Sequence, residues 1–290
     1  MINGCPFCQH KINKIYRKSQ LTICGNYRDI YLCNECGLLY SNHRMDLNEI
    51  QEYMHNLHTN QAGFSFGDPI CVSKGVIKYW KFVMQWVSSG AGDALDIGTF
   101  YGSFCHTLEL LGFRAYGLEP QIEAVKYARK HGINVYQGSF PDDIPVELNQ
   151  KRFVLISLME SICYLRDLKY SLQRINHMLS DDGCVLIKCH QGYSRYYDDN
   201  SYFSRYGDSV QGIPSLSSLG YCLKKTGFEI VKIMGDCSPD LLPPLLRLPP
   251  VPLLQRVVTK LYQLFMLNWT LLGIQRADRL IILAKKIQHT

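Results

Sequence analysis

The chain has 290 residues, of which 47% are hydrophobic and 19% are charged, and its formal net charge is +6 at pH 7. This composition excludes a disordered chain and provides enough apolar residues for a full core. The charge is mild, and residues 1–60 carry six Lys or Arg against five Asp or Glu. Nucleic-acid-binding proteins usually concentrate positive charge on one face, so this balance does not favour such a partner.

The first module, residues 1–45, contains two C-x2-C pairs, Cys5 with Cys8 and Cys33 with Cys36, which are separated by 24 residues. Four thiolates at this spacing suit tetrahedral zinc. A closed four-sulfur site leaves no position for a substrate, so we expect a structural zinc ion. Alternating residues at 21–24 and 30–32 predict short strands of a zinc ribbon between the pairs.

Twelve cysteines are scattered along the chain, and its first residues lack the basic and apolar regions of a secretory signal. Disulfide-rich proteins are typically small and secreted. We therefore expect a cytoplasmic protein in a reducing compartment, where paired cysteines bind metal rather than form disulfides.

Residues 46–90 are expected to form a helical linker or cap. From Lys74 to Val87 the apolar residues recur at helical spacing, namely Val76, Ile77, Trp80, Val83, Met84 and Val87. This helix should pack against the first strand of the domain that follows or cover its ligand pocket.

From residue 91 to residue 290 strands and helices alternate, which predicts an α/β domain with a mainly parallel sheet. The expected strands are 93–97, 114–118, 134–137, 153–158, 184–189, 228–233 and 278–284, and the expected helices are 103–111, 121–130, 168–179 and 214–226. The strand at 153–158 carries no charge and should be central. Together these elements predict a Rossmann-like sheet of seven strands.

The most informative segment runs from Ala94 to Phe104, where a buried strand leads into a glycine turn and then a helix. Such a turn is where an open α/β sheet presents its backbone to a nucleoside-bearing ligand. Glu119 follows Gly98 by 21 residues, at the end of the second strand, where a carboxylate can accept hydrogen bonds from a ribose diol. The glycine spacing is G-x-x-x-G, whereas a nicotinamide dehydrogenase needs G-x-G-x-x-G.

In this order the motifs resemble those of the class I S-adenosylmethionine (SAM)-dependent methyltransferases, over roughly residues 74–290. The resemblance implies that the glycine turn cradles the methionine end of SAM, that Glu119 holds the ribose, and that the loop after the third strand lies beside the adenine. The cofactor-binding residues that it implies are Asp96, Gly98, Thr99, Phe100, Gly102, Glu119, Pro120, Ser139, Phe140 and Leu158. Phe100 stands where the family usually has glycine, and Val154 where it often has an acid.

A zinc ribbon ahead of such a domain is similar to bacterial methyltransferases of sugars and other small acceptors in polysaccharide and natural-product pathways. In some C-methyltransferases of that group a Tyr-His-Glu-His run followed by Tyr-Phe-Ser supplies the base. Here residues 197–204 read YDDNSYFS, so that Asn200 replaces the closing histidine. Asparagine cannot act as a base at neutral pH, and the C-methylation mechanism is therefore not transferred.

Three residues are candidates for the chemistry. His190 ends the fifth strand, at the edge where ligands bind, and its unperturbed pKa of about 6.5 suits a general base; the alternative is a histidine that is only hydrogen-bonded at a strand end. Tyr197 should line an acceptor pocket or belong to a packed lid. Glu160 should contact the acceptor or the cofactor, or be a solvated carboxylate at a strand end.

Residues 240–275 form an apolar insertion before the last strand, which we expect to be helical. Arg256 and Lys260 leave only the stretch from Leu261 to Gln275 without a charge, and this is shorter than the ~20 apolar residues of a membrane span. Three interpretations remain open: a helix packed on the domain, a homodimer interface, or a peripheral helix on a membrane surface.

The sequence therefore predicts a SAM-dependent methyltransferase that acts on a small molecule, a sugar, glycan or natural-product intermediate. One alternative is an RNA methyltransferase guided by the zinc ribbon, whose basic residues are Lys11, Lys14, Arg17, Lys18 and Arg28. A second alternative is a catalytically silent cofactor-binding module, which the departures at Phe100 and Val154 suggest.

Overall fold

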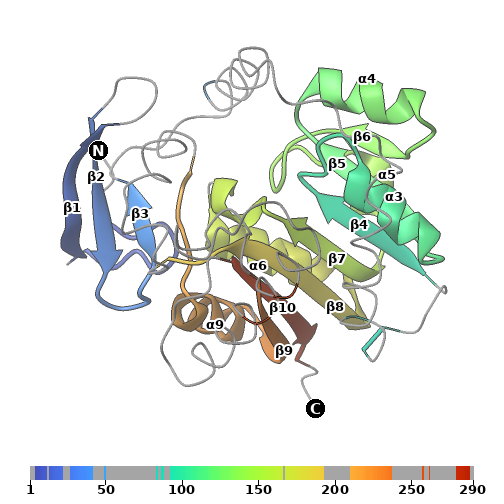
Figure 1. Cartoon of the computed structure of the whole chain (residues 1–290). Coiled ribbons are helices and arrows are strands. Elements are labelled where there is room, and N and C mark those ends of the chain that lie inside the picture. The colour runs from blue at the N-terminus through green and yellow to red at the C-terminus, as the bar shows by residue number, and fades with distance from the viewer. Residues whose placement is uncertain are drawn as a thin grey trace.

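The computed structural model describes residues 4–11, 13–21, 27–41, 49, 83, 86–87, 92–165, 167–192, 210–236, 257, 261 and 279–287. These residues form a three-stranded sheet near the N-terminus and a seven-stranded sheet in the α/β domain. Figure 1 shows the small sheet beside the large one, opposite the ends of its central strands.

The large sheet has the strand order β6-β5-β4-β7-β8-β10-β9. Strands β6, β5, β4, β7 and β8 run parallel to one another, and β10 is antiparallel to both β8 and β9. The bounds are β4 Asp93–Ile97, β5 Arg114–Glu119, β6 Val135–Gln137, β7 Phe153–Met159, β8 Leu179–His190, β9 Phe228–Asp236 and β10 Arg279–Lys286. The predicted Rossmann-like, mainly parallel seven-stranded sheet is confirmed, with the uncharged β7 at its centre.

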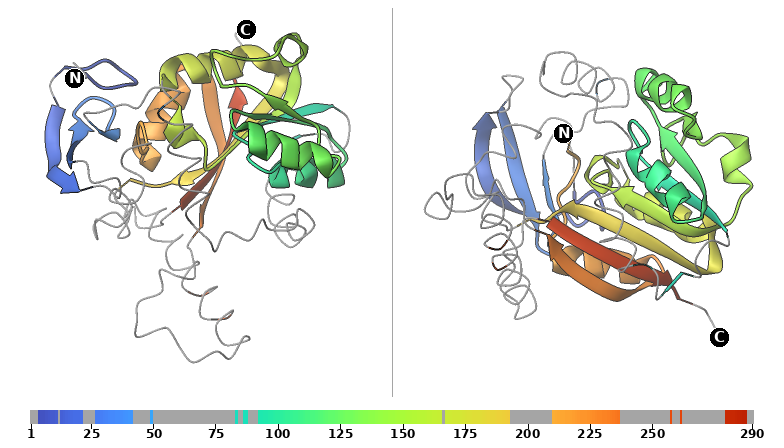
Figure 2. Two further views of the ribbon diagram at one scale, coloured as in Figure 1. Left: turned by 90° about the horizontal axis from the view of Figure 1, so that it is seen from above. Right: turned by 45° about the vertical axis from the view of Figure 1, so that its right-hand side comes forward.

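Helices cover both faces of this sheet (Figure 2). One buried cluster joins the sheet to Leu108 and Val125 of α3 and α4, and another joins it to Leu172 and Leu219 of α6 and α9. The helices are α3 Ser103–Leu110, α4 Ile122–Lys130, α5 Val146–Asn149, α6 Leu168–Met178 and α9 Leu216–Lys225, with a short 3-10 helix η2 Ile162–Tyr164. Both faces of the large sheet are therefore removed from water, and the burial of their apolar side chains stabilises the sheet.

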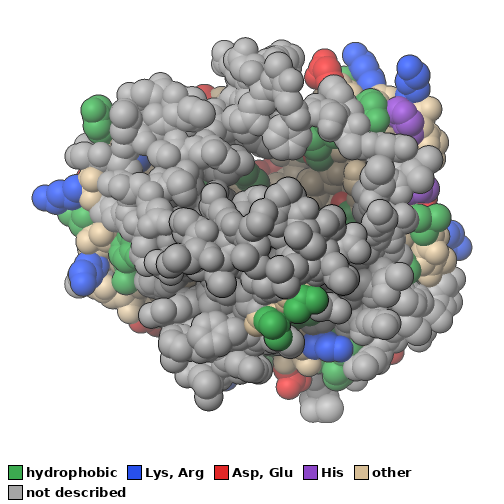
Figure 3. Space-filling view, in the orientation of Figure 1, with side chains coloured by type: hydrophobic (Ala, Val, Ile, Leu, Met, Phe, Trp, Pro, Cys, Tyr) green, Lys and Arg blue, Asp and Glu red, His purple; other side chains and the backbone are tan. Residues whose placement is uncertain are grey.

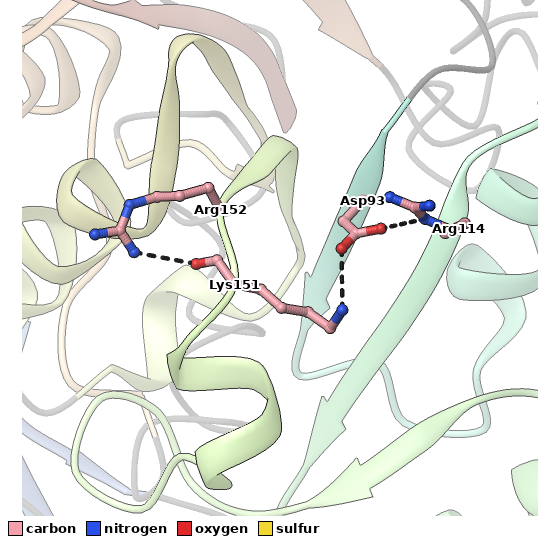
Figure 4. Close-up of polar contacts among 4 residues, drawn as sticks. All are labelled: Asp93, Arg114, Lys151 and Arg152. Carbon is pink, nitrogen blue, oxygen red and sulfur yellow. Dashed lines mark hydrogen bonds and ion pairs between the residues drawn. The ribbon is translucent and has the colours of Figure 1, made fainter.

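An ion-pair cluster aligns three neighbouring strands at the amino edge of the sheet (Figure 4). Asp93 at the start of β4 accepts from Arg114 Nε at 2.5 Å and from Lys151 Nζ at 3.1 Å. Arg114 begins β5, and Lys151 precedes β7. Polar groups that would serve the chemistry lie at the opposite, carboxyl edge.

The strand that ends at His190 begins earlier than predicted, at Leu179 rather than Cys184. A glycine makes this extension possible, because a Cβ at Gly183 would lie 2.9 Å from the carbonyl oxygens of Phe153 and Ser180. The pair Asp182-Gly183 is typical of a turn, but close approach of the backbones lets the strand continue through it.

The small sheet consists of β1 Asn13–Leu21, β2 Tyr27–Cys33 and β3 Leu39–Ser41, paired antiparallel in that order. Of the strand predicted at 21–24, the structure describes only Leu21, which is the last residue of β1, and the rest of β1 was not predicted. Lys14 and Lys18 are exposed on this edge strand, so it lacks the hydrophobic pattern that identifies a half-buried strand.

The ribbon and the α/β domain share one hydrophobic core. Leu39 and Ile213 exchange two backbone hydrogen bonds, Leu39 N to Ile213 O at 3.3 Å and Ile213 N to Leu39 O at 2.7 Å. The Phe7 ring lies 6.1 Å from the Tyr221 ring of α9, edge to face. The ribbon is thus packed onto the domain rather than tethered to it.

Most of the predicted linker helix and of the 240–275 insertion lies outside the described residues. Of the linker, Val83 and Val87 are buried in the cluster that also contains Ala94 of β4. No helix in the described parts of the chain combines the length and the hydropathy that a membrane crossing requires.

Candidate functional site

The turn between β4 and α3 is built around two glycines with positive φ. Gly98 has φ 72°, and a Cβ there would lie 2.6 Å from the Cβ of Ser161. Gly102 has φ 81° and is the residue before α3. Backbone N–H groups of Gly98 and Thr99 donate to the Leu118 carbonyl at 2.8 and 3.3 Å, so the turn is fastened to β5. Only glycine meets both requirements at Gly98.

Glu119, the last residue of β5, is oriented by the same turn. Its Oε2 accepts the backbone N–H of Phe100 at 2.8 Å, and its Oε1 accepts that of Gln121 at 3.0 Å, on the far side of Pro120. Burial raises the pKa of Glu119 to about 7, although these two hydrogen bonds act to lower it. The carboxyl group is therefore fixed in position and costly to ionise without a partner.

Phe100 lies in the centre of the turn with φ 52°, in the left-handed region. Its ring centroid is 3.8 Å from that of Tyr101, and Tyr101 in turn contacts Tyr127 of α4 at 5.0 Å. A side chain rather than a glycine is thus accommodated here, because the ring packs along the turn while the backbone N–H remains bonded to Glu119.

Asp96 is buried beneath the turn. Its Oδ1 accepts from the Ser157 hydroxyl of β7 at 2.6 Å. Burial raises the pKa of Asp96 to about 6, and the hydroxyls of Ser157 and Thr99 lower it. Asp96 thus ties β4 to β7 and places a negative potential directly below the glycine turn.

The remaining predicted cofactor residues lie either in the loop after β6 or in the core of the domain. Ser139 and Phe140 belong to the loop after β6, where Ser139 and Asp143 exchange backbone hydrogen bonds of 2.8 and 2.7 Å and Gly138 N donates to Glu119 O at 3.1 Å. Leu158 is fully buried in the core cluster that also contains Phe140. The loop is therefore adjacent to Glu119, whereas Leu158 is part of the hydrophobic core.

The face seen in Figure 1 is hollowed near the end of β4, and acidic side chains are visible inside the hollow (Figure 3). The residues that fit a SAM cofactor lie at this edge of the sheet. A backbone turn that begins and ends at glycine, an acidic residue one strand away and a second loop beside it are the elements that a nucleoside with a charged tail requires.

A second group of polar residues surrounds Glu160 at the carboxyl ends of β7 and β8. The Glu160 carboxylate lies 3.4 Å from Lys188 Nζ, 3.5 Å from His190 Nε2 and 3.2 Å from Arg279 Nε. Glu160 has φ 65°, and its backbone N–H donates to Lys188 O at 2.7 Å. An acidic residue held in the left-handed region by neighbouring strands is a strained arrangement of the kind found at functional sites.

His190 is largely buried in this cluster. The pKa of His190 is lowered to about 4, by burial above all and also by Arg279 and Lys188, against the opposing effect of Glu160. The pKa is therefore well below the unperturbed value expected from the sequence, and the imidazole is neutral at physiological pH. The structure brings together His190 and Glu160, whereas Tyr197 lies outside the described residues.

The four paired cysteines come together in the ribbon. Their sulfur atoms all lie within 4.8 Å of one another, with Cys5 and Cys36 at 3.5 Å and Cys8 and Cys33 at 3.4 Å. A tetrahedral zinc ion with Zn–S bonds of about 2.3 Å needs sulfurs about 3.8 Å apart. The spacing of the four sulfurs therefore fits zinc.

The sequence reasoning missed Ser157, Ser161, Lys188 and Arg279. Ser157 and Lys188 were visible as polar residues in otherwise apolar strands, which is a signal for a functional or buried-polar role. Arg279 reaches Glu160 only because β10 is inserted antiparallel beside β8, with Arg279 opposite His190. No local pattern specifies that pairing.

Comparison with known proteins gives a family and a fold. Residues 79–233, more than half of the chain, match a family model described as a methyltransferase domain. No curated protein matches the chain.

Two solved structures illustrate the similarity of fold. A SAM-dependent methyltransferase from Archaeoglobus fulgidus aligns with TM-score 0.53 and 18% identity, covering 81% of this chain and 99% of that chain. A chain from the complex between the Haloferax volcanii Trm112 methyltransferase activator and a methyltransferase aligns with TM-score 0.54 and 15% identity, covering 83% and 98%.

Proposed function

Because the chain belongs to the methyltransferase-domain family and is a SAM-dependent methyltransferase, we propose that its acceptor is a small molecule, a sugar or a natural-product intermediate that is methylated on a hydroxyl group. The observation that carries this proposal is the pairing of a neutral, partly buried His190 with Glu160 at the carboxyl edge, beside the cofactor turn. A hydroxyl nucleophile requires such a proton acceptor.

The cofactor half of the site is assigned to the glycine turn and its partners. Bound SAM supplies an electrophilic methyl group on a sulfonium. Backbone groups around Gly98 and Gly102 would hold its methionine end, Glu119 would accept from the ribose hydroxyls, and Ser139 with Phe140 would flank the base. The buried carboxylates of Asp96 and Glu119 favour a cationic ligand, because a nearby positive charge offsets the cost of ionising them.

The acceptor half is assigned to Glu160 and His190. His190 would take the hydroxyl proton as the acceptor oxygen displaces the sulfur of SAM from the methyl carbon, leaving a neutral thioether, and Glu160 would stabilise the imidazolium that forms. A pKa of about 4 makes the imidazole a weak base, which is sufficient when the proton leaves late, after the oxygen has begun to bond. Alignment of the acceptor supplies much of the rate enhancement.

The test is transfer of labelled methyl from SAM to a panel of free and nucleotide-linked sugars and hydroxylated natural products, followed by mass spectrometry. His190→Ala should lower kcat by about 10²-fold or more and leave the dissociation constant of SAM, measured by calorimetry, unchanged. His177→Ala, on the exposed end of α6, is the matched control. Unchanged turnover in His190→Ala with the true acceptor would remove His190 as the base.

The same assay separates the alternative functions. Label incorporated into bulk RNA, with an affinity that falls steeply with salt, would favour recognition by the exposed Lys14 and Lys18 of the ribbon. A folded protein without measurable SAM binding would instead indicate a catalytically silent module.

We also propose that the four cysteines hold one structural zinc ion. Their four sulfurs, within 4.8 Å of one another, would fill all four tetrahedral positions and leave no open position for chemistry. The ion would fix the ribbon against α9, where Tyr221 Oη donates to Glu35 Oε1 at 3.2 Å.

A further inference from the structure

Gln191, the first residue after β8, has a fully buried side chain. Neither its amide oxygen nor its amide nitrogen has a hydrogen-bond partner in the part of the chain that the structure describes. Buried side-chain amides are nearly always paired, because an unpaired polar group in the interior destabilises the fold. An amide left unpaired among the described residues points to a further partner, an ordered water or a ligand.

The position of Gln191 associates it with the acceptor rather than the cofactor. It directly follows His190, at the carboxyl end of β8. The glycine turn follows β4, and β7 lies between β4 and β8 in the sheet. In an open α/β sheet both ligands bind along this edge, and Gln191 lies at the edge two strands away from the glycine turn.

The backbone beside Gln191 is held from two directions. Gly192 N donates to Pro214 O at 3.0 Å, and a Cβ at Gly192 would lie 3.1 Å from Leu39 Cδ1 of the ribbon. The ribbon therefore fixes the chain at this point, and the amide is preorganised rather than free to move.

The surroundings of this segment are otherwise apolar. Leu38 and Leu39 of the ribbon and Ile213 of the domain are all buried, and they form the seam between the two parts of the chain. A second glutamine, Gln211, is also buried at this seam, with its backbone N–H donating to Cys163 O at 2.8 Å. The unpaired amide of Gln191 in this apolar seam destabilises the fold.

We propose that Gln191 is a specificity-determining residue that hydrogen-bonds a neutral, hydroxyl-bearing part of the acceptor, and that the acceptor is therefore polyhydroxylated, as a sugar ring is. A primary amide offers two donors and an acceptor, which a hydroxyl group matches because it both donates and accepts. The amide carries no charge, so it selects hydroxyls rather than a phosphate or carboxylate. This inference rests on the proposed function and narrows its substrate class.

The test compares Gln191→Leu with Gln173→Leu, the same substitution on the exposed face of α6. With a sugar that the wild type methylates, Gln191→Leu should raise the KM for the sugar at least tenfold and leave the dissociation constant of SAM unchanged. For the wild type, the KM for a deoxy analogue that lacks the contacted hydroxyl should exceed the KM for the sugar by a similar factor. For Gln191→Leu, the two KM values should be equal. Equal kinetics in the wild type and Gln191→Leu would overturn the proposal.

Thermal unfolding tests, without any acceptor, whether Gln191 serves ligand binding or the stability of the fold. If Gln191 is kept for ligand binding, replacing an unpaired buried amide by leucine should raise the unfolding midpoint, while Gln173→Leu changes it little. A midpoint lowered by Gln191→Leu would show a structural role and overturn the proposal. A wild type that binds SAM but methylates no hydroxyl compound would contradict the proposed function instead, and the unfolding midpoint would still decide the role of Gln191.

Discussion

Glu119 and Phe100 are joined by a hydrogen bond of 2.8 Å from the backbone N–H of Phe100 to Oε2 of Glu119. This bond links the acidic end of β5 to the centre of the glycine turn. Glu119, the candidate that binds the ribose, and the glycine turn are therefore one structural unit. A substitution in either should alter the position of the other.

Replacing Glu119 by glutamine should weaken SAM binding by about tenfold or more, because the ribose loses a charged acceptor. The glutamine oxygen can still accept one backbone N–H, so the fold should persist. Calorimetry with SAM measures the loss, and circular dichroism checks the fold. Glu123→Gln on the exposed start of α4 is the matched control, and equal affinities in the two variants would contradict the assignment.

The affinity for SAM should fall as the pH drops from 8 to 6. The pKa of Glu119 is about 7, so at pH 6 the ionised form is about one tenth of the total and the affinity falls about tenfold. Asp96, with a pKa of about 6, adds about a factor of two. Calorimetry across this range should show the trend in the wild type, and most of it should disappear in Glu119→Gln.

This loss of affinity should not reflect unfolding. The folded-state pKa values of Asp96 and Glu119 lie above their ordinary values, so the folded protein binds these protons more tightly than the unfolded chain. Protonation of the two groups between pH 8 and 6 therefore stabilises the fold. A thermal midpoint that falls steeply over this range would show that other groups dominate.

Gly98→Ala should destabilise the fold by at least about 2 kcal/mol and abolish SAM binding. The new Cβ would meet the Cβ of Ser161 at 2.6 Å while the backbone is held at φ 72°, so a steric clash adds to backbone strain. Gly132→Ala is the matched control, because Gly132 has φ 77° with nothing within 4 Å of a new Cβ. It should cost only about 1 kcal/mol. Urea unfolding measures the loss of unfolding free energy in each variant. Similar losses in Gly98→Ala and Gly132→Ala would refute the steric clash with Ser161.

Phe100→Gly should be more stable than Phe100→Ala by about 1 kcal/mol, because both lose the ring but only alanine retains the strain of φ 52°. At Tyr101, which has no positive φ, the same two substitutions should show the opposite order, with the alanine variant more stable than the glycine variant. Denaturant unfolding of the four variants measures the difference. The reverse order at Phe100 would mean that the turn relaxes when the ring is removed.

The purified protein should contain one zinc ion per chain by elemental analysis. Cys8→Ala should lose it, and the thermal midpoint should fall by several degrees because the ribbon shares its core with α9. Cys105→Ala, at a buried cysteine of α3 outside the cluster, should keep the zinc. Full zinc content in Cys8→Ala would exclude the four-sulfur site.

Local pattern determined most of the fold. The period of the apolar residues and the glycines that end helices identified the strands and helices of the α/β domain, because each depends on neighbours within a few residues. The C-x2-C pairs were likewise readable, since their spacing alone brings sulfurs together. Patterns failed for β1, whose exposed charges hide its alternation, and for the extension of β8 through Gly183.

The glycine turn and Glu119 could be located from sequence because the order of strand, turn and acid is fixed by the βαβ unit. Glu160 and His190 could be named as candidates because both lie at the ends of strands, but their meeting with Arg279 could not be predicted, since it depends on the antiparallel insertion of β10 beside β8. The same holds for the pKa of His190, which burial and distant charges set. Sequence thus determined which elements form, and the tertiary structure decided which charges meet, because long-range pairing leaves no local signal.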